Sequence, residues 1–129
     1  MGADYRVRCC PDGLITDRRR AVQVMDCTIR DGGLLNQWRF DPGLVRSTFD
    51  ALVAAGIDGM EVGYMNTPPV EGPGEVGPWR FTEEQQLRQV ARASGMQLAV
   101  MLDMGRSSPE RLLPASESLV DVVRVATYA

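Results

Sequence analysis

The residues best suited to chemistry lie in one short run, 26–32, with the sequence Asp-Cys-Thr-Ile-Arg-Asp-Gly. The run closes an apolar, β-rich segment (21–29), so a strand is expected to lead directly into the charged pair Arg30 and Asp31. Active sites of α/β proteins are built at the carboxyl ends of parallel strands. There, Asp31 offers oxygen ligands for Mg²⁺ or Mn²⁺, and Arg30 offers positive charge for a bound enolate. A surface ion pair at a strand end is the equally weighted alternative.

Glu61 is the second candidate, because it lies within the apolar segment 57–64. A carboxylate buried in a strand needs a partner, and Arg30 is the natural one if the two strands are parallel neighbours. We therefore expect Glu61 to point inward and to pair with Arg30. The alternative is that Glu61 faces outward at a helix contact.

Four further residues are candidates for substrate binding. Asp103 ends a third apolar strand, where a substrate contact and a strand-end hydrogen bond are both open. Arg124 lies inside a fourth strand and would bind a substrate carboxylate or form an interior ion pair. Asn36 follows the charged motif and Tyr64 ends the second strand, so both could face the site. Trp38 is expected to be a packing anchor.

The positioning elements alternate along the chain. Strands are expected at 21–29, 57–64, 97–103 and 119–126. A first helix should begin at Asp41 and end at Gly56, a second should be capped by Thr82 and end at Gly95, and a short third should begin at Ser108. Such alternation predicts an α/β fold of parallel βα units, the first half of a (β/α)₈ barrel, over residues 21–129. Residues 1–20 are expected to form an N-terminal hairpin or arm.

The amino-acid composition excludes several classes of function for this chain. Hydrophobic residues make up 44% and charged residues 24% of the 129 residues, and the formal charge is -3, so neither disorder nor nucleic-acid binding is expected. All fourteen basic residues are Arg, and there is no His. Schiff-base lysine chemistry and catalysis through a His of this chain are therefore excluded. The three Cys predict reduced thiols in the cytoplasm, and no apolar run approaches the ~18 residues of a membrane span.

The motif 26–32 resembles the Asp-x-Thr-x-Arg-Asp-Gly signature of the DRE-TIM metallolyases. That superfamily includes 3-hydroxy-3-methylglutaryl-CoA lyase, the pyruvate carboxyltransferase domain and 4-hydroxy-2-oxovalerate aldolase. The continuation 33–40 is most similar to the aldolase-like branch, and segments 60–64 and 120–126 resemble its second and fourth strands.

The resemblance implies a role for each matching residue. Arg30 would polarise the keto group of a 2-keto acid, Asp31 would ligate Mg²⁺ or Mn²⁺, and Glu61 would hold Arg30 in place. The bound metal would act as a Lewis acid while a carbon–carbon bond next to the carbonyl breaks or forms. The family completes its metal site with a His-x-His pair, which this chain lacks, and Leu34 occupies the position of a histidine in the oxovalerate aldolases.

Two classes of function follow from these observations. The chain is the N-terminal part of a metal-dependent aldolase-like barrel acting on a 2-keto acid, or it is a catalytically silent half-barrel that serves as a binding module. Four parallel strands also leave two open sheet edges, so we expect a homo-oligomer or a complementary half-barrel chain as partner. A self-associating half-barrel, in which two copies close eight strands, is the weaker third possibility.

Overall fold

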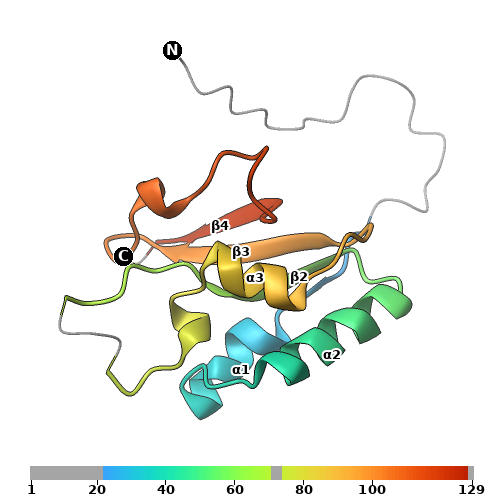
Figure 1. Cartoon of the computed structure of the whole chain (residues 1–129), viewed down its shortest axis with the longest axis horizontal. Coiled ribbons are helices and arrows are strands. Elements are labelled where there is room, and N and C mark those ends of the chain that lie inside the picture. Colours follow the sequence, from blue (N-terminus) through green and yellow to red (C-terminus); the bar gives the residue numbers. More distant parts are fainter. Residues whose placement is uncertain (1–21, 71–73, 128–129) are drawn as a thin grey trace.

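The computed structural model describes residues 22–70 and 74–127. The N-terminal hairpin expected at 1–20 lies outside these residues. The elements alternate along the chain in this order: β1 (Met25–Asp26), α1 (Thr28–Asn36), α2 (Pro42–Ala54), β2 (Gly59–Tyr64), the 3₁₀ turn η2 (Pro78–Arg80), α3 (Glu84–Val90), β3 (Gln97–Asp103), the 3₁₀ turn η3 (Pro109–Arg111) and β4 (Val122–Ala126) (Figure 1).

The four strands form a single parallel sheet in the order β1-β2-β3-β4. Neighbours in sequence are therefore neighbours in space, as right-handed βα crossovers produce. The register of β2 against β3 shifts between Glu61 and Gly63, where β2 carries an irregularity. This arrangement confirms the α/β fold class and matches part of a (β/α)₈ barrel.

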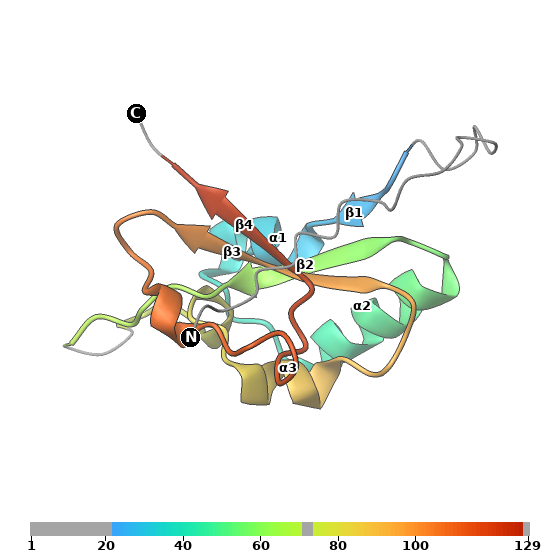
Figure 2. The same ribbon diagram turned by 90° about the horizontal axis from the view of Figure 1, so that it is seen from above.

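The hydrophobic core lies between one face of the sheet and the helices. Figure 2 shows α2 and α3 on the same side of the sheet. Side chains from both helices and from alternate strand positions fill this layer: Val45, Phe49, Met60, Val62, Leu87, Val90, Leu98, Val100 and Leu102. Because side chains alternate along a strand, Glu61, Ala99 and Met101 belong to the opposite face. No helix within residues 22–70 and 74–127 is long and apolar enough to cross a membrane.

Helix α2 forms where its sequence places it. Asp41 is the N-cap, and its carboxylate accepts hydrogen bonds from Gly43 N and Leu44 N at 2.8 and 3.3 Å. Pro42 takes the first helical position, where the missing N–H costs nothing. Gly56 follows the helix with φ of +71°, a conformation that glycine adopts without strain.

The strand expected at 21–29 is much shorter in the structure, and this part of the expectation was wrong. Only Met25 and Asp26 pair in the sheet, and α1 begins at Thr28. The reason is local. The Asp26 carboxylate accepts hydrogen bonds from Thr28 N at 3.0 Å and Thr28 Oγ1 at 2.7 Å, which turns the chain out of the strand.

The second helix also differs from its expectation. Its N-cap is Glu83, whose backbone N–H donates to Gln86 Oε1 at 3.0 Å, whereas Thr82 is buried and donates to Trp79 O. The helix ends at Val90, before the expected stop at Gly95. The short helix expected after Ser108 is present as η3.

Candidate functional site

Arg30 and Asp31 lie in α1, immediately beyond the carboxyl end of β1. The expected position at a strand end is confirmed, although the motif continues as a helix rather than a loop. The Arg30 side chain is only 14% exposed and that of Asp31 is 56% exposed. The two are joined by an ion pair between Arg30 Nη1 and Asp31 Oδ1.

Glu61 is fully buried and lies between two arginines. Arg30 Nε donates to Glu61 Oε2 at 2.6 Å, so the expected inward ion pair is present. Arg124, from β4, reaches the same oxygen with Nη1 at 3.2 Å. The other oxygen, Glu61 Oε1, is buried without a hydrogen-bond partner. Residues from α1, β2 and β4 thus meet at one carboxylate, and two positive charges oppose its single negative charge.

Arg124 takes one of the two roles that its sequence position left open, the interior ion pair. It forms the interior ion pair with Glu61, yet its side chain remains 45% exposed. Its Nη1 also lies 3.8 Å from the Cys27 thiol, which sits at the start of α1. Part of its guanidinium is therefore available to a ligand at the same end of the sheet.

The protonation states follow from these contacts. Burial by itself lowers the pKa of Arg30, but hydrogen bonds to Glu61 and Tyr64 and the charges of Glu61 and Asp31 outweigh it, so the pKa is raised. Burial, and next the charge of Glu61, raise the pKa of the Cys27 thiol, while the contact with Arg30 opposes them. Arg30 is therefore a permanent cation, and Cys27 remains a neutral thiol at physiological pH.

The described residues do not fit a metal ion on their own. Asp31 supplies one exposed carboxylate, but it is already paired with Arg30. Within residues 22–70 and 74–127, no group of three or more His, Cys, Asp or Glu side chains could hold a metal. Any divalent ion bound at Asp31 would need ligands from elsewhere or from water.

Asp103 does not meet Arg30 or Arg124 but anchors a separate network. The side chain is fully buried, and its Oδ2 accepts from Asn66 Nδ2 at 2.8 Å and Arg80 Nη2 at 2.9 Å. Asn66 Oδ1 in turn accepts from Asp103 N at 3.0 Å and from Ser107 Oγ at 2.7 Å. The strand-end hydrogen bond, rather than a substrate contact, is the role that the structure shows for Asp103.

Arg80 is a contributor that the sequence analysis missed. Its guanidinium lies over the Tyr64 ring at 4.0 Å and over the Trp38 ring at 4.7 Å. Tyr64 is buried beneath it, 5.9 Å from the Arg30 guanidinium. A buried carboxylate at the end of β3 was a signal that a cation had to lie nearby, but it could not name which of the arginines.

Asn36 and the glycines play local structural roles. Asn36 Nδ2 donates to Arg39 O at 3.1 Å, which fastens the turn that follows α1. At Gly33, which follows the motif, a Cβ would overlap the Trp38 indole. The space left by Gly33 is therefore filled by Trp38, which is the packing anchor that the sequence predicted.

No protein-family model matches the chain. The fold is similar to the crystal structure of the N-terminal domain of a putative aldolase from Bacteroides vulgatus, with a TM-score of 0.68 and 33% sequence identity. The similarity covers 81% of this chain and 35% of that chain, so this chain spans little more than a third of its neighbour. The chain therefore has the fold of a partial α/β barrel, similar to that N-terminal domain.

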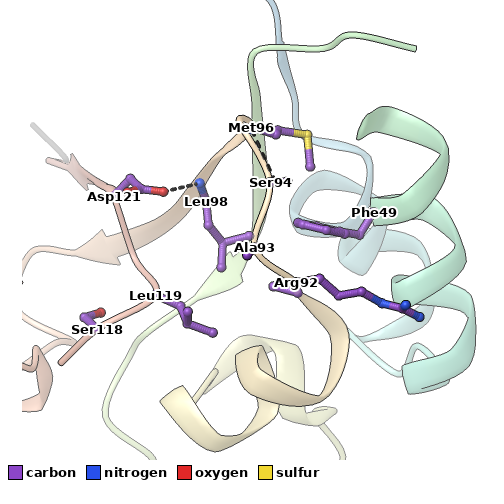
Figure 3. A pocket seen from close by; sticks show the side chains of 10 residues that line it. Phe49, Arg92, Ala93, Ser94, Met96, Leu98, Ser118, Leu119 and Asp121 are labelled. Carbon is purple, nitrogen blue, oxygen red and sulfur yellow. Dashed lines mark hydrogen bonds between the residues drawn. The ribbon is translucent and has the colours of Figure 1, made fainter. Parts of the chain in front are cut away.

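A separate shallow pocket, of about 170 Å³, lies away from the charged cluster. Figure 3 shows that it opens between α2, the segment after α3 and the amino-terminal ends of β3 and β4, with Phe49, Leu98 and Leu119 on its walls. The acidic residue that lines it, Asp121, is already hydrogen-bonded, because its Oδ2 accepts from Leu98 N at 2.9 Å. The pocket lies at the opposite ends of the strands from Arg30, so it contributes nothing to the candidate site.

Proposed function

We propose that the chain is the N-terminal part of a DRE-TIM-like barrel that binds a 2-keto acid for carbon–carbon bond cleavage or formation. The observation that carries the proposal is the placement of Arg30 and Arg124 on either side of the buried Glu61. Arg30 lies beyond the carboxyl end of β1, the end at which barrel enzymes build their active sites, and it reaches Glu61 and Arg124 within β2 and β4. Similarity to an aldolase N-terminal domain supports the same class of chemistry.

Each charged residue has a distinct role in the proposal. Arg124 binds the substrate carboxylate with the exposed part of its guanidinium. Arg30 faces the keto oxygen, which receives the electron pair when the adjacent carbon–carbon bond breaks, and it stabilises the resulting enolate. Glu61 touches neither group of the substrate; it fixes the position of both arginines.

Metal dependence and a proton-transfer group require contributions beyond the described residues. Asp31 would supply one ligand to Mg²⁺ or Mn²⁺, the ion that would add Lewis-acid polarisation in a complete site. Leu34, at the position of a family histidine, is 70% exposed and can move no proton. We therefore expect this chain by itself to bind a substrate analogue without releasing pyruvate from 4-hydroxy-2-oxo acids.

Binding of oxalate, a planar analogue of the pyruvate enolate, tests the proposal. Calorimetry should show that Arg30→Met and Arg124→Met each weaken oxalate binding by about tenfold or more. Arg92→Met is the matched control, because Arg92 forms only an exposed, 3.8 Å pair with Asp50. Equal affinities in the two site variants and the control would contradict the proposal.

The alternative function is a catalytically silent binding module, and the exposed Leu34 favours it. Pyruvate release with added Mg²⁺ or Mn²⁺ is not expected from this chain in either case. Turnover that is abolished by Asp31→Asn would contradict the silent alternative and would also show that this chain alone holds a complete catalytic site. We also propose that β4 associates with a second half-barrel, since Val123 and Val125 are 39% and 59% exposed on this edge strand. Light scattering over a concentration series should show mass above that of the monomer, and a constant monomer mass would exclude association.

A further inference from the structure

We infer that Arg80 is a positioning residue, which holds Arg30 in the orientation needed to bind an anion. The inference rests on the proposed function only in taking Arg30 as the anion-binding group. Arg80 itself lies at the end of η2, in the connection between β2 and α3, and touches neither Glu61 nor Arg124 in the structure.

The Arg80 guanidinium is held on several sides. Asp103 Oδ2 accepts from Nη2 at 2.9 Å, and Asp103 is fully buried. The cation lies over two aromatic rings, with its central carbon 4.0 Å from the Tyr64 centroid and 4.7 Å from the Trp38 centroid. A planar guanidinium can stack on rings and form a directed ion pair at the same time, which a lysine ammonium cannot. Arg80 therefore fixes the relative orientation of the two rings.

Both rings, Trp38 and Tyr64, interact with Arg30. The Trp38 indole Nε1 donates to Arg30 O at 2.9 Å, so the ring is bonded to the backbone that carries the cation. The Tyr64 ring meets Trp38 edge to face, at 5.7 Å and 87°, and lies 5.9 Å from the Arg30 guanidinium. A movement of the two rings is thus transmitted to both the backbone and the side chain of Arg30.

The segment that carries Arg80 is anchored independently. Gly77 N donates to Gln37 O at 2.6 Å, and the Trp79 indole donates to Phe40 O at 3.0 Å. A side chain at Gly77 would overlap the Trp38 backbone, so the loops after β1 and β2 lie in direct contact. Since these contacts do not involve the Arg80 side chain, replacing that side chain should leave the segment in place and free the two rings.

Nuclear magnetic resonance of the arginine Nε–Hε groups provides a readout that needs no ligand. Arg30 Nε–H, which bonds to Glu61, should give a strongly displaced signal in the native chain. In Arg80→Met this signal should move toward the position of a free arginine. Arg88→Met is the matched control, because Arg88 is 54% exposed and removes the same charge from α3. The Trp79 indole signal reports whether the loop has stayed in place.

Oxalate affinity provides the second readout. Arg80→Met should weaken oxalate binding by about fivefold to tenfold, and it should add nothing in an Arg30→Met background, because both changes disable the same group. Arg80→Lys keeps the charge beside Asp103 but not the planar stack, so it should show the same two effects in a chain that folds. These variants therefore separate positioning from a purely structural contribution.

The outcomes are distinguishable. An unchanged Arg30 signal in folded Arg80→Met or Arg80→Lys would overturn the inference, whatever oxalate does. If the Arg30 signal moves toward the free-arginine position in Arg80→Met, but the native chain does not bind oxalate, the result would support positioning and overturn the proposed function. Loss of oxalate affinity that is equally large with and without Arg30 would show that Arg80 acts on the ligand by another route, and would also overturn the inference.

Discussion

Two fully buried carboxylates occupy neighbouring strands of the same sheet, yet their surroundings differ. Asp103 is bonded by Asn66 and Arg80, of which Asn66 is 2% exposed and the Arg80 side chain 15%. Glu61 is bonded through one oxygen by Arg30 and Arg124, its second oxygen has no partner, and the Arg124 side chain is 45% exposed. Each carboxylate neutralises arginine charge. Of the two, Glu61 is the one with a buried oxygen that lacks a hydrogen-bond partner and with a half-exposed arginine beside it.

The difference distinguishes a structural network, here called the brace and made of Asp103, Asn66 and Arg80, from the candidate ligand site around Glu61. A buried polar network whose donors and acceptors are paired rigidifies the chain, and the Asp103 network ties β3 to the connection after β2. An unpartnered buried oxygen beside a half-exposed cation costs stability, which proteins tolerate where function requires it. The Asp103 network therefore positions the loop, and ligand binding by the arginines around Glu61 remains our proposal.

The largest effect that tests this comparison is the loss of stability on Asp103→Asn. The substitution leaves Arg80 buried without a compensating charge, which should cost ~3–5 kcal/mol. Glu61→Gln should cost less, because the half-exposed Arg124 can be solvated and one oxygen of Glu61 was already unpaired. Urea unfolding of both variants at pH 7 measures the difference. A smaller loss in Asp103→Asn than in Glu61→Gln would reverse the assignment of brace and site.

A double-mutant cycle between Arg30 and Glu61 examines the site directly. Arg30→Met and Glu61→Gln should each destabilise the chain, because Arg124 and Asp31 replace the lost partner only in part. The double variant should recover part of the loss because both members of the buried pair are then removed. The expected coupling is ~2 kcal/mol. Denaturant midpoints under reversible unfolding provide the four values. A coupling near zero would mean that the 2.6 Å contact contributes nothing to stability in solution.

The same contrast explains what could be predicted from the sequence. Helix α2 and strand β3 follow from local signals, the Asp41-Pro42 cap and an unbroken apolar run, and both have the expected starts. The Arg30–Glu61 pair could be predicted because Arg30 lies just beyond β1 and Glu61 lies within β2, the parallel neighbour of β1. Burial of Glu61 followed from its apolar flanks. In each case the deciding contact lies within one element or between successive strands.

The features that the sequence did not predict depend on competing local hydrogen bonds or on contacts between residues far apart in the chain. Thr28 and Ile29 are β-branched, which favoured a strand. In the structure the Asp26 carboxylate accepts hydrogen bonds from Thr28, and α1 begins there instead. The Arg80–Asp103 pair joins residues that are 23 positions apart, with α3 and most of β3 between them, and no spacing rule chooses Arg80 over other arginines. The intramolecular partners of Asn36 and Asp103 were hidden for the same reason, because only the fold brings them close.

Gly33→Ala should break the packing that joins the site to the brace. Alanine usually stabilises a helix interior relative to glycine, but here its Cβ would overlap the Trp38 indole and force the ring away from Arg80. We expect a net loss of about 1 kcal/mol or more. Gly32→Ala is the matched control, since its Cβ would meet only the tip of the Phe40 ring, at 3.2 Å. Thermal unfolding measures both variants, and equal stabilities would contradict this role of Gly33.

The smallest expected effect concerns the reactivity of Cys27, at the edge of the Glu61 cluster. Burial and the Glu61 charge raise the pKa of the Cys27 thiol, so at pH 8 it should react with iodoacetamide more slowly than a free cysteine. Glu61→Gln removes one raising cause and should speed the reaction. Arg30→Met removes an opposing contact and should slow it. Because the folded pKa lies above the unfolded one, stability should also fall as pH rises past the ordinary thiol value. Rates measured in a Cys9→Ser, Cys10→Ser background isolate this thiol, and an equal rate in all three chains would show that Glu61 does not act on Cys27.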